Sequence, residues 1–186
     1  MPGAQYYLDP FEVEMPSGQS GRNKYKKKRN CYVVDAPSIE VRQIPSNATL
    51  IIDGHSSSGS PTISRFQFPD GKANQTIRFE RLAELLSGAR LPVTHGLIRL
   101  LACEGNSYAQ NLAIELGKVG YNDIAVGGYT VTNYQVEGQR TRFGPDHYDE
   151  NDDLIGDKPI KWYNASGKQI QKPYVLDRKT VRWQGV

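Results

Sequence analysis

Two apolar segments that end in chemically reactive residues decide the fold: TLIIDGH at residues 49–55 and LIRLLACEG at residues 97–105. Each begins as a short continuous apolar run, which is typical of a strand covered on both faces of a parallel sheet. A third such run, IAV, occupies residues 124–126. Apolar residues at helical spacing over 78–86 and 107–117 separate the three runs. This order predicts right-handed crossovers and an α/β fold with a mostly parallel central sheet.

Outside this central pattern, the sequence predicts an N-terminal arm and several shorter β-segments within one domain. The first thirty residues are rich in Gly, Ser, Pro and Lys, and we expect residues 1–30 to form a flexible basic arm. We expect residues 31–186 to form a single domain, which suits the chain length of 186 residues. Shorter strands are predicted at residues 31–34, 63–68 and 180–183, and residues 130–136 alternate between apolar and polar. Residues 145–157 are predicted to form an acidic loop, and residues 160–170 a β-hairpin.

The composition excludes several classes of protein. Hydrophobic residues make up 38% and charged residues 23%, and the net charge of +3 does not call for nucleic acid as a partner. No apolar run reaches membrane-spanning length, and the N-terminus lacks the pattern of a cleaved signal peptide. With two cysteines there is no disulfide framework and no CxxC zinc pair, so we expect reduced thiols and no metal. We therefore expect a cytoplasmic protein or one exported without a cleaved signal.

The two reactive residues are His55 and Cys103. Ligands of parallel sheets bind beyond the carboxyl ends of the strands, so adjacent strands would bring both side chains to one edge. An imidazole can take the proton of a thiol and later protonate a leaving amine. The N–H groups of Gly54, Ser56 and Cys103 are the candidate oxyanion donors. We also expect that Gly105, lacking a side chain, lets a substrate backbone approach.

Other titratable residues are weaker candidates. His95 lies before the Cys103 strand, about 20 Å from its far end, and is set aside in favour of His55. Cys31 opens a strand and is read as structural. Asp53 either orients His55 or points the other way, because adjacent residues of an extended chain face opposite sides. Glu104 either shapes a pocket for a basic side chain or is simply solvated.

The segments LIIDGH at residues 50–55 and IRLLACEG at residues 98–105 resemble the motifs of clan CD cysteine peptidases. This group includes caspases, gingipains, clostripain, separase and the self-cleaving domains of large bacterial toxins, which are the most similar in pattern. The resemblance covers residues 31–134 and implies a caspase-like three-layer sandwich with helices on both sheet faces and C-terminal β-hairpins. One departure is Ser56, because the family has Gly directly after the histidine.

The resemblance implies a cysteine endopeptidase that cleaves itself or a partner protein through a His55–Cys103 dyad, as a bacterial effector or toxin would. It needs no cofactor for the chemistry. The toxin-type relatives are activated by inositol hexakisphosphate, and the one dense basic cluster here is Lys24, Lys26, Lys27, Lys28 and Arg29, which is otherwise a solvated tail boundary. Two alternatives stay open: a Cys–His acyltransferase or deamidase, and an inactive caspase-like binding module.

Overall fold

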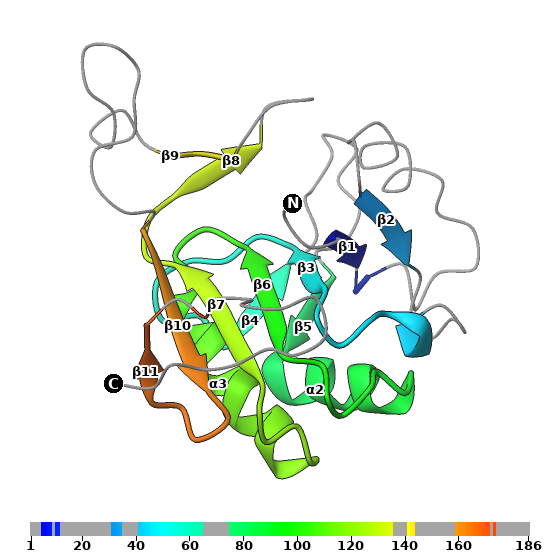
Figure 1. Cartoon of the computed structure of the whole chain (residues 1–186). Coiled ribbons are helices and arrows are strands. Elements are labelled where there is room, and N and C mark those ends of the chain that lie inside the picture. The colour runs from blue at the N-terminus through cyan, green and yellow to red at the C-terminus, as the bar shows by residue number, and fades with distance from the viewer. Residues whose placement is uncertain are drawn as a thin grey trace.

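The computed structural model describes residues 5–8, 10–11, 31–34, 41–64, 75–135, 141–143, 159–171 and 173. Within these residues the fold is α/β, with a mostly parallel central sheet (Figure 1). The strands of that sheet are, in spatial order, β11 (Gln169–Ile170), β10 (Ile160–Asn164), β7 (Ala125–Tyr129), β6 (Leu97–Leu101), β3 (Thr49–Asp53), β1 (Gln5–Leu8) and β2 (Cys31–Val34).

The three central strands β3, β6 and β7 confirm the predicted parallel core. β3 pairs with β6, and β6 with β7, both in parallel. Every residue of β7 is buried, as are the three central residues of β3. The continuous apolar runs are explained by this position, because a strand in the middle of a covered sheet has no face toward water.

Two helices, α2 (Phe79–Gly88) and α3 (Asn106–Lys118), supply the crossovers between these strands. Along α3 the buried side chains recur at helical spacing, from Tyr108 through Leu112 to Leu116. Gly120, with φ of +100°, ends the turn after α3. The N–H of Gly120 donates to the Gly117 carbonyl and that of Tyr121 to the Leu116 carbonyl, which is the Schellman pattern. The sequence therefore placed both helices correctly.

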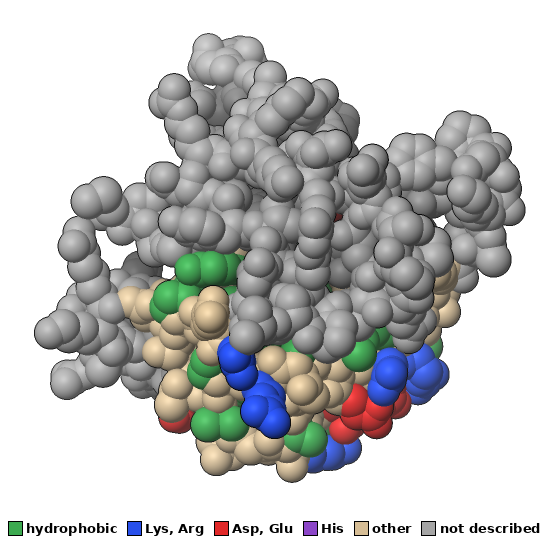
Figure 2. All heavy atoms as spheres, turned by 90° about the vertical axis from the view of Figure 1, so that its right-hand side faces the viewer, with side chains coloured by type: hydrophobic (Ala, Val, Ile, Leu, Met, Phe, Trp, Pro, Cys, Tyr) green, Lys and Arg blue, Asp and Glu red, His purple; other side chains and the backbone are tan. Residues whose placement is uncertain are grey.

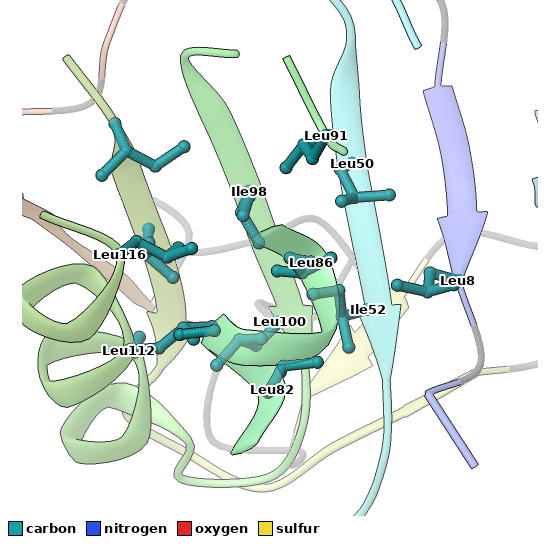
Figure 3. Close-up of a cluster of buried hydrophobic side chains, with 14 of the residues drawn as sticks. Leu8, Leu50, Ile52, Leu82, Leu86, Leu91, Ile98, Leu100, Leu112 and Leu116 are labelled. Atoms are coloured by element: carbon teal, nitrogen blue, oxygen red, sulfur yellow. The ribbon is translucent and has the colours of Figure 1, made fainter. Parts of the chain in front are cut away.

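Both helices lie on the same face of the sheet (Figures 1 and 3). Alternate strand residues such as Leu50, Ile52 and Leu100 share one hydrophobic cluster with Leu82 of α2 and Leu112 of α3. The opposite face carries a separate cluster of Leu97, Ala125 and Trp162. The expected helices on both faces are therefore not found within the described residues, where the one helical layer covers a single face.

Strand β1 is the main difference from the sequence-based expectation. Residues 1–30 were expected to form a flexible arm, but Gln5–Leu8 pairs in parallel with β3 on one side and β2 on the other. Leu8 and Phe11 are buried in the main hydrophobic cluster. The short segment was overlooked because four residues next to Gly, Pro and acidic neighbours give little periodicity. The basic cluster from Lys24 to Arg29 lies outside the described residues.

A small antiparallel pair stands between the histidine segment and α2. It consists of β4 (Thr62–Ser64) and β5 (Thr76–Arg78), with Ile63 opposite Ile77. The predicted strand 63–68 begins within β4, and its residues 65–68 lie outside the described residues. Before β3, the short 3₁₀ helix η2 (Val41–Gln43) adds Val41 to the core.

The β10–β11 hairpin confirms the one predicted at residues 160–170, and β8 (Asn133–Gln135) lies in the alternating stretch 130–136, whereas β9 (Thr141–Phe143) was not predicted. β8 pairs antiparallel with β9, and β10 with β11. The carboxamide oxygen of Asn164 accepts hydrogen bonds from the Ser166 and Lys168 N–H groups, which shapes the β10–β11 turn. The predicted strand 180–183 and the acidic loop 145–157 lie outside the described residues. No helix of the described chain is long and apolar enough to cross a membrane.

Candidate active site

The register of β3 and β6 brings His55 and Cys103 to one level of the sheet edge. Asp53, the last residue of β3, stands opposite Leu101, the last residue of β6. His55 and Cys103 each follow their strand end by two residues. Because the strands are adjacent and parallel, the expected meeting of the two segments at the carboxyl edge follows from the pairing itself.

The backbone of His55 is fixed, whereas its side chain is exposed. His55 and Ser64 exchange two backbone hydrogen bonds, both 2.7 Å, which form a bridge at the end of β4. Gly54 is packed against Ile63, and a Cβ added at Gly54 would lie 3.2 Å from the Ile63 Cβ. The glycine of the GH pair therefore allows the histidine segment to lie against β4.

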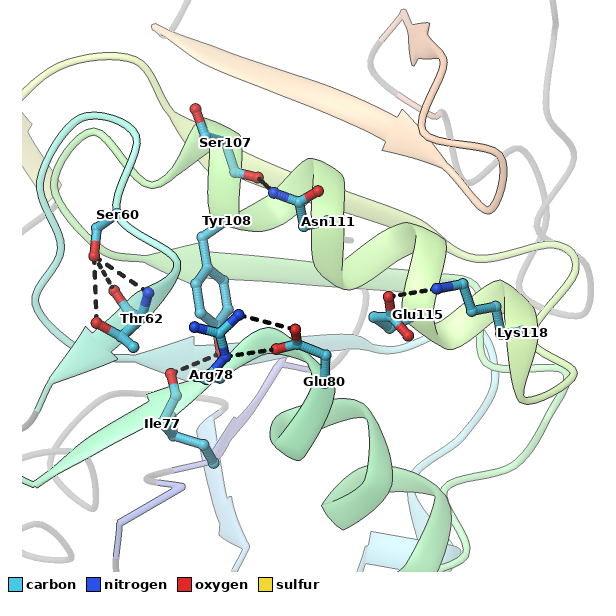
Figure 4. Close-up of polar contacts among 10 residues, drawn as sticks. All are labelled: Ser60, Thr62, Ile77, Arg78, Glu80, Ser107, Tyr108, Asn111, Glu115 and Lys118. Atoms are coloured by element: carbon cyan, nitrogen blue, oxygen red, sulfur yellow. Dashed lines mark hydrogen bonds and ion pairs between the residues drawn. The ribbon is translucent and has the colours of Figure 1, made fainter.

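The loop after His55 is a defined turn. The Ser60 N–H donates to the Ser57 carbonyl at 3.0 Å, and Gly59 has φ of +71°. These features describe a β-turn with a left-handed residue at its third position, as in type II turns. The Ser60 hydroxyl also donates to the Thr62 carbonyl at 2.8 Å (Figure 4). The turn keeps the loop close to β4.

Cys103 lies between a buried strand end and the start of α3. Its side chain is half-buried and carries a thiol rather than a disulfide. The preceding Ala102 is buried, and the Gly105 N–H donates to the Ala102 carbonyl at 3.3 Å. The chain therefore turns sharply at Cys103 before α3 begins at Asn106.

Gly105 lies where the start of α3 packs against β7. It is buried, and its carbonyl oxygen would lie 2.5 Å from a Cβ added at Gly128 of β7. The expectation was that Gly105 lets a substrate approach. The glycine at position 128 allows the start of α3 to lie directly against β7, while a Cβ at Gly105 itself would meet Ala102, 3.1 Å from its carbonyl oxygen. Nearby, the Tyr108 hydroxyl donates to the Ile77 carbonyl at 3.3 Å and ties α3 to β5 (Figure 4).

Glu104 connects three loops at this edge. Its carboxylate Oε2 accepts a hydrogen bond from the Ser58 N–H at 3.0 Å, and its own N–H donates to the Val131 carbonyl at 3.1 Å. Glu104 as a residue is half-buried, while the hydrogen bond of its carboxylate to Ser58 is exposed, so the carboxylate is in contact with solvent and engaged with a second loop. The roles of Ser58 and Val131 were missed, since nothing in the sequence marks which loop residues will meet.

Two of the expected auxiliary groups are engaged with each other. The Gly54 N–H donates to Asp53 Oδ1 at 3.0 Å, so in this structure it does not point at an oxyanion. The same bond occupies Oδ1 of Asp53 with the N–H of the next residue. The Ser56 N–H has no acceptor among the described residues. Of these two predicted oxyanion donors, only Ser56 has an N–H without an acceptor among the described residues.

The residues set aside in the sequence analysis lie elsewhere. His95 is fully buried just before β6, with Nε2 3.0 Å from the Leu97 carbonyl oxygen. Burial lowers the pKa of His95 to about 4. Cys31 is the first residue of β2 and stands level with Thr49, the first residue of β3. Both residues therefore belong to the amino edge of the sheet, away from His55 and Cys103.

Charges of both signs are interleaved around α2. Arg78 pairs with Glu80 at 3.0 Å, and Arg81 with Glu84 at 3.1 Å. Figure 2 shows basic and acidic side chains next to each other at the lower right of that face. Arg78 and Arg81 are thus each matched by a neighbouring carboxylate. No three metal-binding side chains gather anywhere in the described part of the chain.

No protein-family model matches the chain, and no curated protein matches its sequence.

Proposed function

We propose that the chain is a cysteine peptidase with a caspase-like fold, in which Cys103 is the nucleophile and His55 the general acid–base. The observation that carries this proposal is the β3–β6 register, which brings the two segments to one level of the carboxyl edge. The exposure of His55 and the half-burial of Cys103 leave a route for a peptide. The protein's substrate would be a polypeptide, its own chain or a partner's.

The proposed reaction proceeds through a thioester. The Cys103 thiol transfers its proton to the His55 imidazole, and Sγ attacks the carbonyl carbon of the scissile bond. The oxyanion accepts a hydrogen bond from the Ser56 N–H. The C–N bond breaks as His55 returns the proton to the departing amine. Water, deprotonated by His55, then attacks the thioester, and the released thiolate regains the proton.

Covalent labelling tests this proposal. A panel of peptidyl acyloxymethyl ketones with basic, acidic and apolar residues at the scissile position would be incubated with the full chain. We expect one thioether adduct, located by peptide mass spectrometry at Cys103. Cys103→Ala should abolish labelling, whereas the matched control Cys31→Ser should label at the wild-type rate. Labelling that persists in Cys103→Ala would overturn the proposal.

Mass spectrometry of candidate target proteins separates the proposal from its enzymatic rivals, and the labelling assay separates it from a binding module. An acyltransferase or deamidase would modify target proteins without cutting them, and intact mass would change by one dalton or by an acyl group. A binding module would form no adduct. We also propose inositol hexakisphosphate as an activator, recognised by the basic cluster Lys24 and Lys26 to Arg29. An unchanged labelling rate with that compound would remove this part of the proposal.

A further inference from the structure

Glu104 stands at the junction of the three loops that follow β3, β6 and β7. It is covalently attached to Cys103, its carboxylate accepts the Ser58 N–H of the histidine loop, and its N–H donates to Val131 beyond β7. The Glu104–Ser58 hydrogen bond joins residues that are 46 positions apart in the sequence. One side chain thus connects the loop that carries His55 to the turn that carries Cys103.

The backbone of Glu104 is strained, which argues against an incidental contact. Its φ is +48°, in the left-handed region that glycine adopts at no cost. Such conformations persist in non-glycine residues only when surrounding interactions enforce them, and they concentrate at functional sites. At Glu104 the enforcing interactions are the bonds to Val131 and Ser58.

We infer that Glu104 is a positioning residue, whose carboxylate holds the histidine loop over Cys103. This inference rests on the proposed His55–Cys103 dyad and adds the contact that sets its geometry. With the Ser58 N–H released, the remaining hydrogen bonds from this loop to other elements would, among the described residues, all run to β4, at the His55–Ser64 bridge and from the Ser56 and Ser60 hydroxyls to Thr62. The His55 backbone would stay held by the Ser64 bridge, but the loop that follows it would no longer be held toward Cys103, so the imidazole would spend less time near the thiol.

The turn offers a variant that removes only the donor. Ser58 is the second residue of the Ser57–Ser60 turn, and Gly59 follows it with φ of +71°. Proline is common at the second position of type II turns, so Ser58→Pro preserves the turn while deleting the N–H. Ser58→Pro and Glu104→Ala therefore break one hydrogen bond from its two ends.

The test follows iodoacetamide alkylation of Cys103 in the full chain between pH 6 and pH 9. An imidazole held near the thiol maintains reactivity at pH 6, where an isolated thiol is almost unreactive. Glu104→Ala and Ser58→Pro should each lower the pH 6 rate about tenfold and leave the pH 9 rate within about twofold. Glu104→Gln keeps an acceptor oxygen and should restore most of the rate. A merely loosened fold would instead raise the rate at every pH.

Two further comparisons decide the outcome. The double variant should react no more slowly than either single variant, because both remove the same interaction. Glu84→Ala, on the exposed face of α2, serves as the matched control. Wild-type rates at pH 6 in both Glu104→Ala and Ser58→Pro, with a slow His55→Ala, would overturn the positioning role and leave the dyad intact. A wild-type profile in His55→Ala would overturn the dyad and this inference together.

Discussion

The two histidines described in the structure lie at opposite edges of the same sheet. His55 follows β3 at the carboxyl edge, with an exposed side chain on a backbone fixed by β4. His95 precedes β6 at the amino edge and is fully buried against the Leu97 carbonyl. Each residue is adjacent to a glycine in the sequence, so the local motif does not distinguish them. What distinguishes the two histidines is the end of the strand on which each lies, because ligands of parallel sheets bind beyond the carboxyl ends of the strands.

The largest expected effect is at the carboxyl edge. His55→Ala should lower the rate of labelling by a peptidyl acyloxymethyl ketone by about 10²-fold or more, the usual contribution of a general acid–base. The thermal midpoint should change little, since the side chain is exposed. Stopped labelling reactions resolved by mass spectrometry measure the rate. A labelling rate lowered less than threefold in His55→Ala would contradict the assignment of chemistry to the carboxyl-edge histidine.

Packing beneath the same edge gives the next effect. Gly128→Ala would place a Cβ 2.5 Å from the Gly105 carbonyl oxygen. Neither atom can rotate away, because the backbone fixes the position of both. We expect a loss of about 3 kcal/mol in the free energy of unfolding. Urea titration followed by circular dichroism measures this loss. A stability equal to that of the wild type would show that α3 does not begin against β7.

The amino edge should respond to pH rather than to labelling. The pKa of His95 is lowered to about 4 by burial, against 6.5 when unfolded. Below pH 6.5 the unfolded chain therefore binds the proton more readily, and the stability present at pH 7 is lost as pH falls toward 4. Between pH 7 and pH 5 His95 should account for a loss of about 2 kcal/mol.

The matched variant for that loss is His95→Gln, which keeps a donor for the Leu97 carbonyl and does not titrate. Urea titrations at pH 7 and pH 5 should show a shallower pH dependence in His95→Gln than in the wild type. Its labelling rate at pH 7 should equal that of the wild type. Equal pH slopes in the two proteins would contradict the buried, neutral state of His95.

The smallest expected effect is a gain. Gly88 is the last residue of α2, in the segment that leads to the amino edge of the sheet. A Cβ added at Gly88 would have no atom within 4 Å, and its φ is not positive. Gly88→Ala should raise the free energy of unfolding by about 0.5–1 kcal/mol, through helix propensity and the entropy of the unfolded chain. Thermal melts of Gly88→Ala and Gly128→Ala should therefore shift in opposite directions. A destabilised Gly88→Ala would contradict the open environment of this glycine.

Much of the central sheet could be predicted from the sequence, because buried parallel strands are continuous apolar runs and the helices between them are periodic. Strand β1 could not be predicted, since Gln5–Leu8 becomes a strand only by pairing between β2 and β3. Ile77 fits the apolar face of a helix equally well, yet it belongs to β5 because Ile63 stands opposite it.

The candidate site was predictable to a similar degree. The strand ends placed His55 and Cys103 at one edge, since register follows from neighbouring parallel strands. The contacts of Glu104 with Ser58 and Val131 could not be predicted, because they depend on how three loops fold toward each other. The expectation that Gly105 leaves room for a substrate stays a prediction, and the sequence did not show that the Gly105 carbonyl would lie 2.5 Å from a Cβ added at Gly128 of β7.

The crystal structure of the chain reacted with a peptidyl acyloxymethyl ketone tests the central claim most directly. We expect a thioether bond from the probe to Cys103 Sγ, with a His55 ring nitrogen about 4 Å or less from that sulfur and the probe ketone oxygen about 3 Å from the Ser56 nitrogen. A probe attached to any other residue, or a His55 ring about 8 Å or more from Sγ, would contradict the assignment of the two residues to one active site.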